Sequence, residues 1–101
     1  MRVYRTLEAR ARLLEIQAYI AQNSPAAARK AAARLVRRSR QLATPPLVGR
    51  RLPEYPETEL RELLERPFRI IYAVKPGRVE IITLKHYRQR LPRNPRRLAR
   101  R

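Results

Sequence analysis

Hydrophobic positions early in the chain recur at helical spacing. Ala9, Leu13, Ile16 and Ile20 follow an i, i+4, i+7, i+11 pattern, which predicts an amphipathic helix over residues 7–22. A second apolar stripe lies on nearly the opposite side of this helix and consists of Leu7, Ala11, Leu14 and Ala18. Two stripes indicate a helix that packs on two neighbours, such as a sheet and another helix.

A second helix is predicted immediately after the first. Ser24 is a favourable N-cap, and Pro25 fits the first helical position because its missing N–H is not needed there. The connection is too short for anything but an antiparallel helical hairpin. The second helix is expected to run from Pro25 to about Ala43, along a stripe formed by Ala28, Ala32, Leu35, Ser39 and Leu42.

The second half of the chain is patterned as strands. A loop is expected over residues 44–51, which contain two Pro and one Gly. Residues 68–74 and 79–84 are rich in β-branched and aromatic side chains, so they predict two strands. Pro76 and Gly77 suit a type II turn between them, and because that turn is not the preferred two-residue hairpin turn we expect a wider loop.

Two further segments are open to more than one interpretation. The composition of residues 59–66 favours a helix, whereas a strand there would complete a three-stranded meander. Residues 1–6 alternate weakly and would supply a fourth strand.

Composition excludes several classes of protein. The chain has 101 residues, which is one small domain, and 44% of them are hydrophobic, which is enough for a core. With no Cys, no Asp and a single His, neither a disulfide framework nor a metal site is expected. No apolar run approaches the roughly 20 residues that span a bilayer. We therefore expect a soluble cytoplasmic protein with no cofactor, no metal and no membrane partner.

The charge is strongly positive and unevenly placed. Lys and Arg number 25 against 8 Glu, a net charge of +17, and no acid occurs between Glu15 and Glu54. This pattern predicts a polyanionic partner such as nucleic acid, the ribosome or an acidic protein. Residues 85–101 carry eight basic residues and no acid, so residues 91–101 are expected to form a solvated basic tail beyond a domain of residues 1–90. The candidate contacts to RNA or the ribosome are Arg37, Arg38, Arg50, Arg51, Lys85, Arg88 and Arg90.

Few residues are candidates for acid–base chemistry. His86 is the only His, and Tyr87 follows it at the end of the last expected strand. Basic neighbours favour the less positive form of such a group, which suits a general base. Arg61 and Arg69, on adjacent expected strands, are candidates to clamp a scissile phosphate. The alternative interpretation of each is a strand residue that faces water.

Several motifs stand at defined places in this order of elements: the Asn-Ser-Pro turn of the hairpin, the Pro-rich loop that ends in Gly49-Arg50, Leu60-Arg61-Glu62-Leu63, Phe68-Arg69-Ile70-Ile71-Tyr72 and the last strand ending at His86. Together they resemble the RelE/ParE superfamily of bacterial type II toxins over about Val3 to Arg90. The resemblance implies an α+β fold in which an N-terminal strand and an antiparallel helical hairpin pack on a small, mainly antiparallel sheet. It also implies that residues 59–66 form a strand.

The superfamily resemblance implies two different activities. RelE-like members cut mRNA on the ribosome without a metal, and their YoeB-like version matches this chain at Arg69, His86 and Tyr87. The catalytic Glu of that version has no clear match, because the sequence around Glu54 differs. ParE-like members poison DNA gyrase and lack that active site. Both branches imply a cognate antitoxin, usually acidic and disordered where it wraps the toxin.

Three hypotheses follow. The first is a ribosome-dependent, metal-independent endoribonuclease in which Arg69, His86, Tyr87 and Arg61 are catalytic. It predicts that Arg69, His86 and Tyr87 converge in one basic pocket. The alternative is a ParE-like inhibitor of DNA gyrase that is not an enzyme. A second alternative is a basic nucleic-acid-binding module without toxin activity. Separation of Arg69 from His86 by the sheet would count against the first hypothesis.

Overall fold

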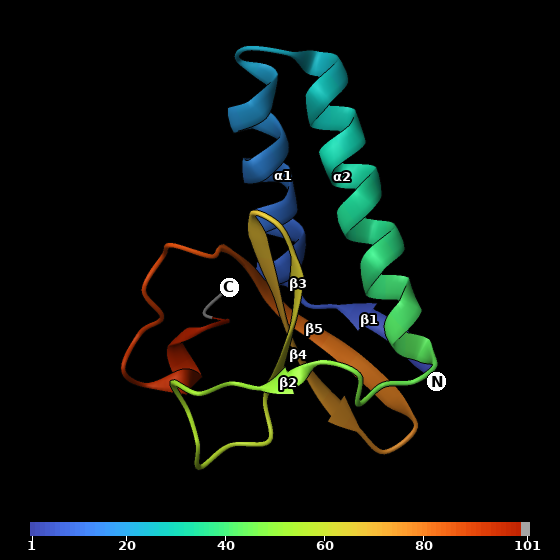
Figure 1. The fold of residues 1–101 in the computed structure, drawn as a ribbon, viewed down its shortest axis with the longest axis vertical. Helices are drawn as coiled ribbons and strands as arrows, with labels where there is room; N and C mark the ends of the chain where they lie inside the picture. The colour runs from blue at the N-terminus through green and yellow to red at the C-terminus, as the bar shows by residue number, and fades with distance from the viewer. Residues whose placement is uncertain (100–101) are drawn as a thin grey trace.

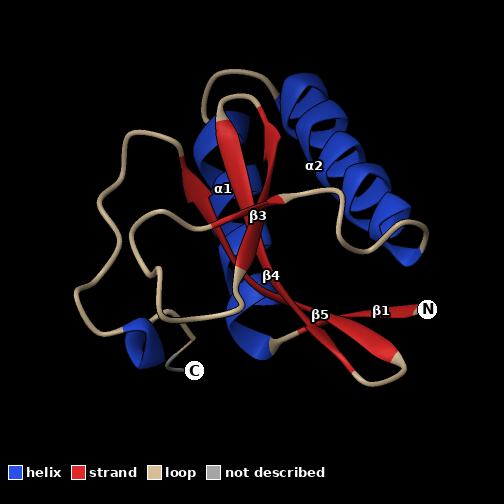
Figure 2. Cartoon of the chain, turned by 60° about the horizontal axis from the view of Figure 1, so that its bottom comes forward, coloured by secondary structure: helices blue, strands red, loops and turns tan. Residues whose placement is uncertain are grey.

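A computed structural model describes residues 1–99; Arg100 and Arg101 of the expected basic tail lie outside the described residues. Within that range, a helical hairpin covers one face of a five-stranded sheet, which confirms the expected α+β fold (Figures 1 and 2). The strands are β1 (Arg2–Arg5), β2 (Arg50–Arg51), β3 (Arg61–Glu65), β4 (Phe68–Lys75) and β5 (Arg78–His86). The helices are α1 (Leu7–Ala21), α2 (Pro25–Arg40) and two single 3₁₀ turns, η1 (Gln41–Ala43) and η2 (Pro95–Arg97).

The helical hairpin begins where the sequence predicts. The Thr6 hydroxyl accepts a hydrogen bond from the Ala9 N–H and caps α1, while the Ser24 hydroxyl caps α2 at the Ala27 N–H, at 3.1 Å in both cases. The α-helical part of α2 ends at Arg40 because the chain tightens into η1 before the Pro-rich loop. Each cap satisfies one of the amide groups that a helix start leaves without a partner.

The sheet has the order β1-β5-β4-β3-β2, with β1 parallel to β5 and the remaining pairs antiparallel. Residues 61–65 form a strand, as the resemblance implied, and the N-terminal strand is present. The expected wide loop between β4 and β5 is wrong. Lys75 pairs directly with Arg78, because Gly77 at φ +77° lets the chain reverse within two residues. The short strand β2 was not predicted.

The two faces of the sheet bury different parts of the chain. Beneath the helices, the core contains Leu35, Leu63, Ile70, Tyr72, Ile81 and Leu84. On the other face, Ile71 packs with Leu52, Tyr55 and Leu98, joined by the half-buried Leu91. Within the expected tail, Leu98 is only 2% exposed, because Ile71 offers an apolar surface for it to cover.

The two stripes of α1 have different environments. Leu13, Ile16 and Ile20 pack against the core under the helices. As expected, α1 has two neighbours, α2 and strand β5. Leu7 and Leu14, from the opposite stripe, are each 67% exposed, so this stripe does not provide the second contact. Among the described residues, no helix is long and apolar enough to cross a membrane.

Candidate functional site

Arg69, a candidate phosphate clamp, is buried and paired with two carboxylates. Its side chain is 7% exposed, and its Nε donates to Glu62 at 2.5 Å. Its two terminal nitrogens lie 2.9 and 3.0 Å from the oxygens of Glu54. Burial opposes the positive charge, but the hydrogen bonds that Arg69 donates to Glu54 and Glu62 outweigh this effect and raise the pKa of Arg69.

Glu62 stands at the centre of this network. Its side chain is 0% exposed, and its second oxygen accepts from Arg50 Nε at 2.5 Å. The hydrogen bond from Arg69 holds the pKa of Glu54 below its usual range. This buried ion-pair network, formed by Arg50, Glu54, Glu62 and Arg69, ties β2, β3, β4 and the loop after β2 together. Arg69 is thus engaged inside the protein.

His86 lies on the other side of the sheet from Arg69. In the β4–β5 ladder His86 pairs with Phe68, whereas Arg69 pairs with Lys85. Paired residues share a face and neighbours alternate between faces, so His86 and Arg69 project in opposite directions. The His86 ring meets Phe68, part of the core under the helices, edge-on at 6.0 Å. The structure does not bring Arg69 and His86 into one pocket.

His86 and Tyr87, although adjacent in sequence, do come together. β5 ends at His86, and the two rings stack at 4.9 Å between centroids with 23° between planes. The Arg88 N–H donates to His86 Nδ1, and Arg88 Nε donates to the Tyr87 hydroxyl, both at 3.1 Å. We call His86, Tyr87 and the Arg88 side chain that holds them the aromatic stack. Tyr87 in this stack is 49% exposed.

Arg61 is hydrogen-bonded to the loop that precedes β2. Its terminal nitrogen donates to the Gly49 carbonyl at 2.7 Å. On β4, the Tyr72 hydroxyl accepts from the Gly49 N–H at 2.9 Å and donates to the Pro46 carbonyl at 2.8 Å. A Cβ at Gly49 would collide with the Glu62 backbone oxygen and the Tyr72 hydroxyl. Sequence reasoning missed this role of Tyr72; the signal was a tyrosine that follows two isoleucines in a buried strand.

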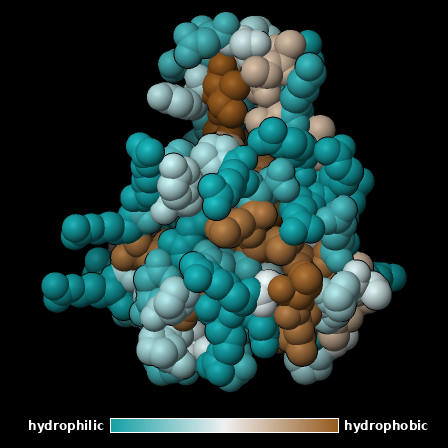
Figure 3. All heavy atoms as spheres, in the orientation of Figure 1, coloured by the Kyte–Doolittle hydropathy of each residue, from teal (hydrophilic) through white to brown (hydrophobic). Residues whose placement is uncertain are grey.

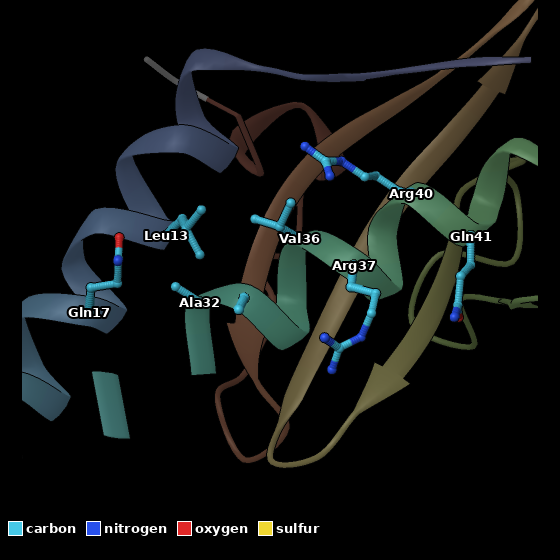
Figure 4. A pocket seen from close by; sticks show the side chains of 8 residues that line it. Leu13, Gln17, Ala32, Val36, Arg37, Arg40 and Gln41 are labelled. Atoms are coloured by element: carbon cyan, nitrogen blue, oxygen red, sulfur yellow. The ribbon is translucent and has the colours of Figure 1, made fainter. Parts of the chain in front are cut away.

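The candidate polyanion contacts on α2 differ in their availability. Arg37 is exposed and lines a groove of about 720 Å³ between α1 and α2, together with Arg40 (Figure 4). Leu13 and Val36 supply apolar side chains to the same groove. Arg38, by contrast, pairs with Glu65 at 3.5 Å.

The other candidate contacts lie on the sheet and beyond β5. Arg50 joins the buried network but keeps 65% of its side chain exposed, and Arg51 donates to the Thr58 carbonyl at 2.6 Å. Lys85 is half-buried; burial lowers its pKa, and Arg12 adds to the effect. Arg88 and Arg90 are exposed. The candidate cations thus occupy several separate surfaces.

A groove of about 770 Å³ separates the helical hairpin from the end of the sheet. Figure 3 shows hydrophobic surface between the two helices near the hairpin turn. Basic residues at this groove are Arg12, Lys30 and Arg34, with Glu15 the one acid in its lining. Its apolar lining includes Ile16, Ile20, Phe68 and Leu84. Within residues 1–99, no group of three His, Cys, Asp or Glu side chains could hold a metal ion.

Comparisons with known proteins agree with this architecture. The family model for the ParE toxin of the type II toxin–antitoxin system parDE matches residues 3–91. A solved structure described as the chromosomal ParDE TA system from P. aeruginosa shares 29% sequence identity, with a TM-score of 0.72 over 85% of this chain and 95% of that chain. No curated protein matches. The chain belongs to the ParE family of toxins from type II toxin–antitoxin systems.

Proposed function

We propose that this toxin arrests growth by binding DNA gyrase and that it does not cut RNA. The observation that carries the proposal is the position of Arg69. Its guanidinium is 7% exposed and bound by Glu54 and Glu62, on the opposite side of the sheet from His86. A metal-independent ribonuclease needs a free cation at the scissile phosphate and an acid or base on the same side.

A phosphate could reach Arg69 only by displacing those carboxylates. Glu62 would then stay buried without one of its two arginine partners. Removing one partner of a buried ion pair costs about 3–5 kcal/mol. This cost favours a structural role for Arg69 and therefore favours target binding over RNA cleavage.

We further propose that a cognate acidic antitoxin binds this chain in the cytoplasm. The groove between the helical hairpin and the sheet supports this assignment, since it combines apolar residues such as Ile20 and Phe68 with Arg12, Lys30 and Arg34. A segment with alternating acidic and apolar side chains would complement both features. The net charge of +17 would speed such an encounter.

Ribonuclease activity is the second candidate, and one observation favours it. The stack of His86, Tyr87 and Arg88 is partly exposed and lies beside the groove just described. An imidazole and a phenol at a basic surface are groups that general acid–base chemistry uses.

Two assays on the same protein test the proposal. The purified chain should inhibit supercoiling by DNA gyrase, and brief induction in a bacterial host should arrest growth without new RNA 5′ ends inside translated codons. The variants His86→Ala and Tyr87→Phe should arrest growth as the wild type does. New 5′ ends that disappear in His86→Ala would instead establish a ribonuclease. If the folded protein causes no growth arrest, the remaining hypothesis is a basic nucleic-acid-binding module without toxin activity.

A further inference from the structure

The outer face of α1 carries an exposed apolar stripe that has no role in the function proposed above. It consists of Leu7, Ala11, Leu14 and Ala18, and we call it the α1 stripe. Leu7 and Leu14 are each 67% exposed, Ala18 is also exposed and Ala11 is half-buried. At about 100° per residue, these positions fall within about 60° of one another around the helix. A helix face that meets only water is normally polar, so the α1 stripe indicates a surface for a partner.

The spacing of the α1 stripe is that of a two-stranded coiled coil. Its residues follow one another at steps of four, three and four, so Ala11 and Ala18 take a positions, and Leu7 and Leu14 take d positions, of a heptad repeat. Small side chains at a allow two such helices to approach closely, and leucine at d is the usual choice in parallel dimers. Because α1 is already folded within the domain, pairing does not have to nucleate the helix.

The charge of α1 suits a second copy of this chain. α1 contains two Glu and two Arg, so its net charge is zero, whereas α2 contains six basic residues and no acid. An acidic partner would be attracted to α2 more strongly than to this neutral helix. A second copy of a chain with a net charge of +17 meets less local repulsion along α1 than along α2.

The residues that flank the α1 stripe specify the direction in which two copies pair. Arg10 occupies a g position and Glu15 occupies the e position five residues later. In a parallel pair of helices, g of one copy lies beside that e position of the other, so Arg10 meets Glu15 of the other copy on both sides. In an antiparallel pair each flank meets its own copy, which keeps Arg10 and Glu15 apart.

Both flanking side chains are accessible to a second copy. Arg10 is exposed, and the Glu15 side chain is 44% exposed. Glu15 accepts a hydrogen bond from Arg12 at 3.0 Å, and a carboxylate can accept from several donors at once. Glu8, the other acid on this flank, is buried against Arg12 and Thr83, so it does not face a partner.

We propose that two copies of this chain pair in parallel through the α1 stripe, with an Arg10–Glu15 ion pair on each side. The dimer has twofold symmetry, so every contact occurs twice. It requires neither gyrase nor RNA cleavage and therefore goes beyond the proposed function; a failure of either proposal leaves the other standing. Because the stripe spans only two heptads, the interface lies at the weak end of specific contacts, and we expect dissociation constants in the micromolar range.

Sedimentation equilibrium of the purified full chain, from about 10 to about 500 µM, covers the range of a weak dimer. Leu14→Lys should raise the dissociation constant about tenfold or more, because two apolar side chains leave the interface. Leu47→Lys is the matched control, since Leu47 is 59% exposed in the loop that precedes β2. It should dimerise as the wild type does, and urea unfolding should show that both variants are folded.

Charge reversal tests the parallel direction independently of the apolar contact. Arg10→Glu should weaken the dimer because acids then meet on both sides, although the net charge of the chain falls from +17 to +15. Arg29→Glu has the same net charge and changes an exposed residue of α2, so it should not weaken the dimer. An equal mixture of Arg10→Glu and Glu15→Arg should restore dimers that contain one copy of each. Its summed charge equals that of two wild-type copies, since one variant loses two charges and the other gains two.

A wild type that stays monomeric over the whole concentration range would overturn the proposal. So would dimers that a folded Leu14→Lys variant leaves unchanged. Arg10→Glu dimers as tight as those of Arg29→Glu would overturn the parallel direction. A monomeric wild type that binds an acidic amphipathic peptide, and loses this binding in Leu14→Lys, would assign the α1 stripe to a different protein instead.

Discussion

Replacement of Arg69 separates a structural role from a catalytic one. In Arg69→Ala, Glu62 keeps only Arg50, and Glu54 loses the contacts at 2.9 and 3.0 Å. Removing one partner of a buried pair costs about 3–5 kcal/mol. Because Glu54 is 38% exposed and regains water, we expect the lower end, about 3 kcal/mol.

Urea unfolding followed by circular dichroism measures this loss. A slope of about 1–3 kcal/mol per molar urea converts about 3 kcal/mol into a fall of about 1–3 M in the midpoint. This is a large share of the total stability of a small domain, about 5–15 kcal/mol. Arg66→Ala is the control: its side chain is exposed, so its midpoint should stay close to that of the wild type.

The reasoning also predicts how Arg69→Ala affects growth arrest. Activity should fall together with the amount of folded protein, and an antitoxin or low temperature that favours folding should restore it in part. A variant with the midpoint of the wild type but no toxicity would refute the argument, because Arg69 would then act on the target.

Three further variants test other contacts described above. Tyr72→Phe should cost about 1–3 kcal/mol and abolish the hydrogen-exchange protection of the Gly49 amide, which loses its buried partner. Leu98→Ala should lower the free energy of unfolding by about 2–5 kcal/mol, whereas a solvated tail would show almost no change in the urea midpoint. Glu54→Gln should reduce the loss of stability in acid. Because Arg69 lowers the pKa of Glu54, the Glu54 carboxylate stabilises the folded state at a pH above its unfolded pKa of about 4.3. This stabilisation disappears as the pH falls through the lower pKa of the folded state. Urea midpoints measured from about pH 6 to about pH 3 would show the trend.

Local signals were sufficient for the helical hairpin and for the two long strands of this fold. The caps Thr6 and Ser24 satisfy helix-end amides within three residues of themselves, so a short stretch of sequence specifies each helix start. The β-branched runs likewise predicted β4 and β5. Residues 61–65 were ambiguous because their composition suits a helix, and pairing with β4 decides in favour of a strand.

The sequence by itself determined the helical hairpin, the two long strands, the charge of +17 and the resemblance to a toxin superfamily. Only the tertiary structure decided which arginine side chains are held by carboxylates inside the protein. The partners of Arg69 lie 7 and 15 residues away in the chain, and strand register together with the path of one loop brings them into contact. Ile71 similarly covers Leu98, far along the chain. Long-range ion pairs and apolar contacts of this kind depend on how elements pack, and no local pattern encodes them.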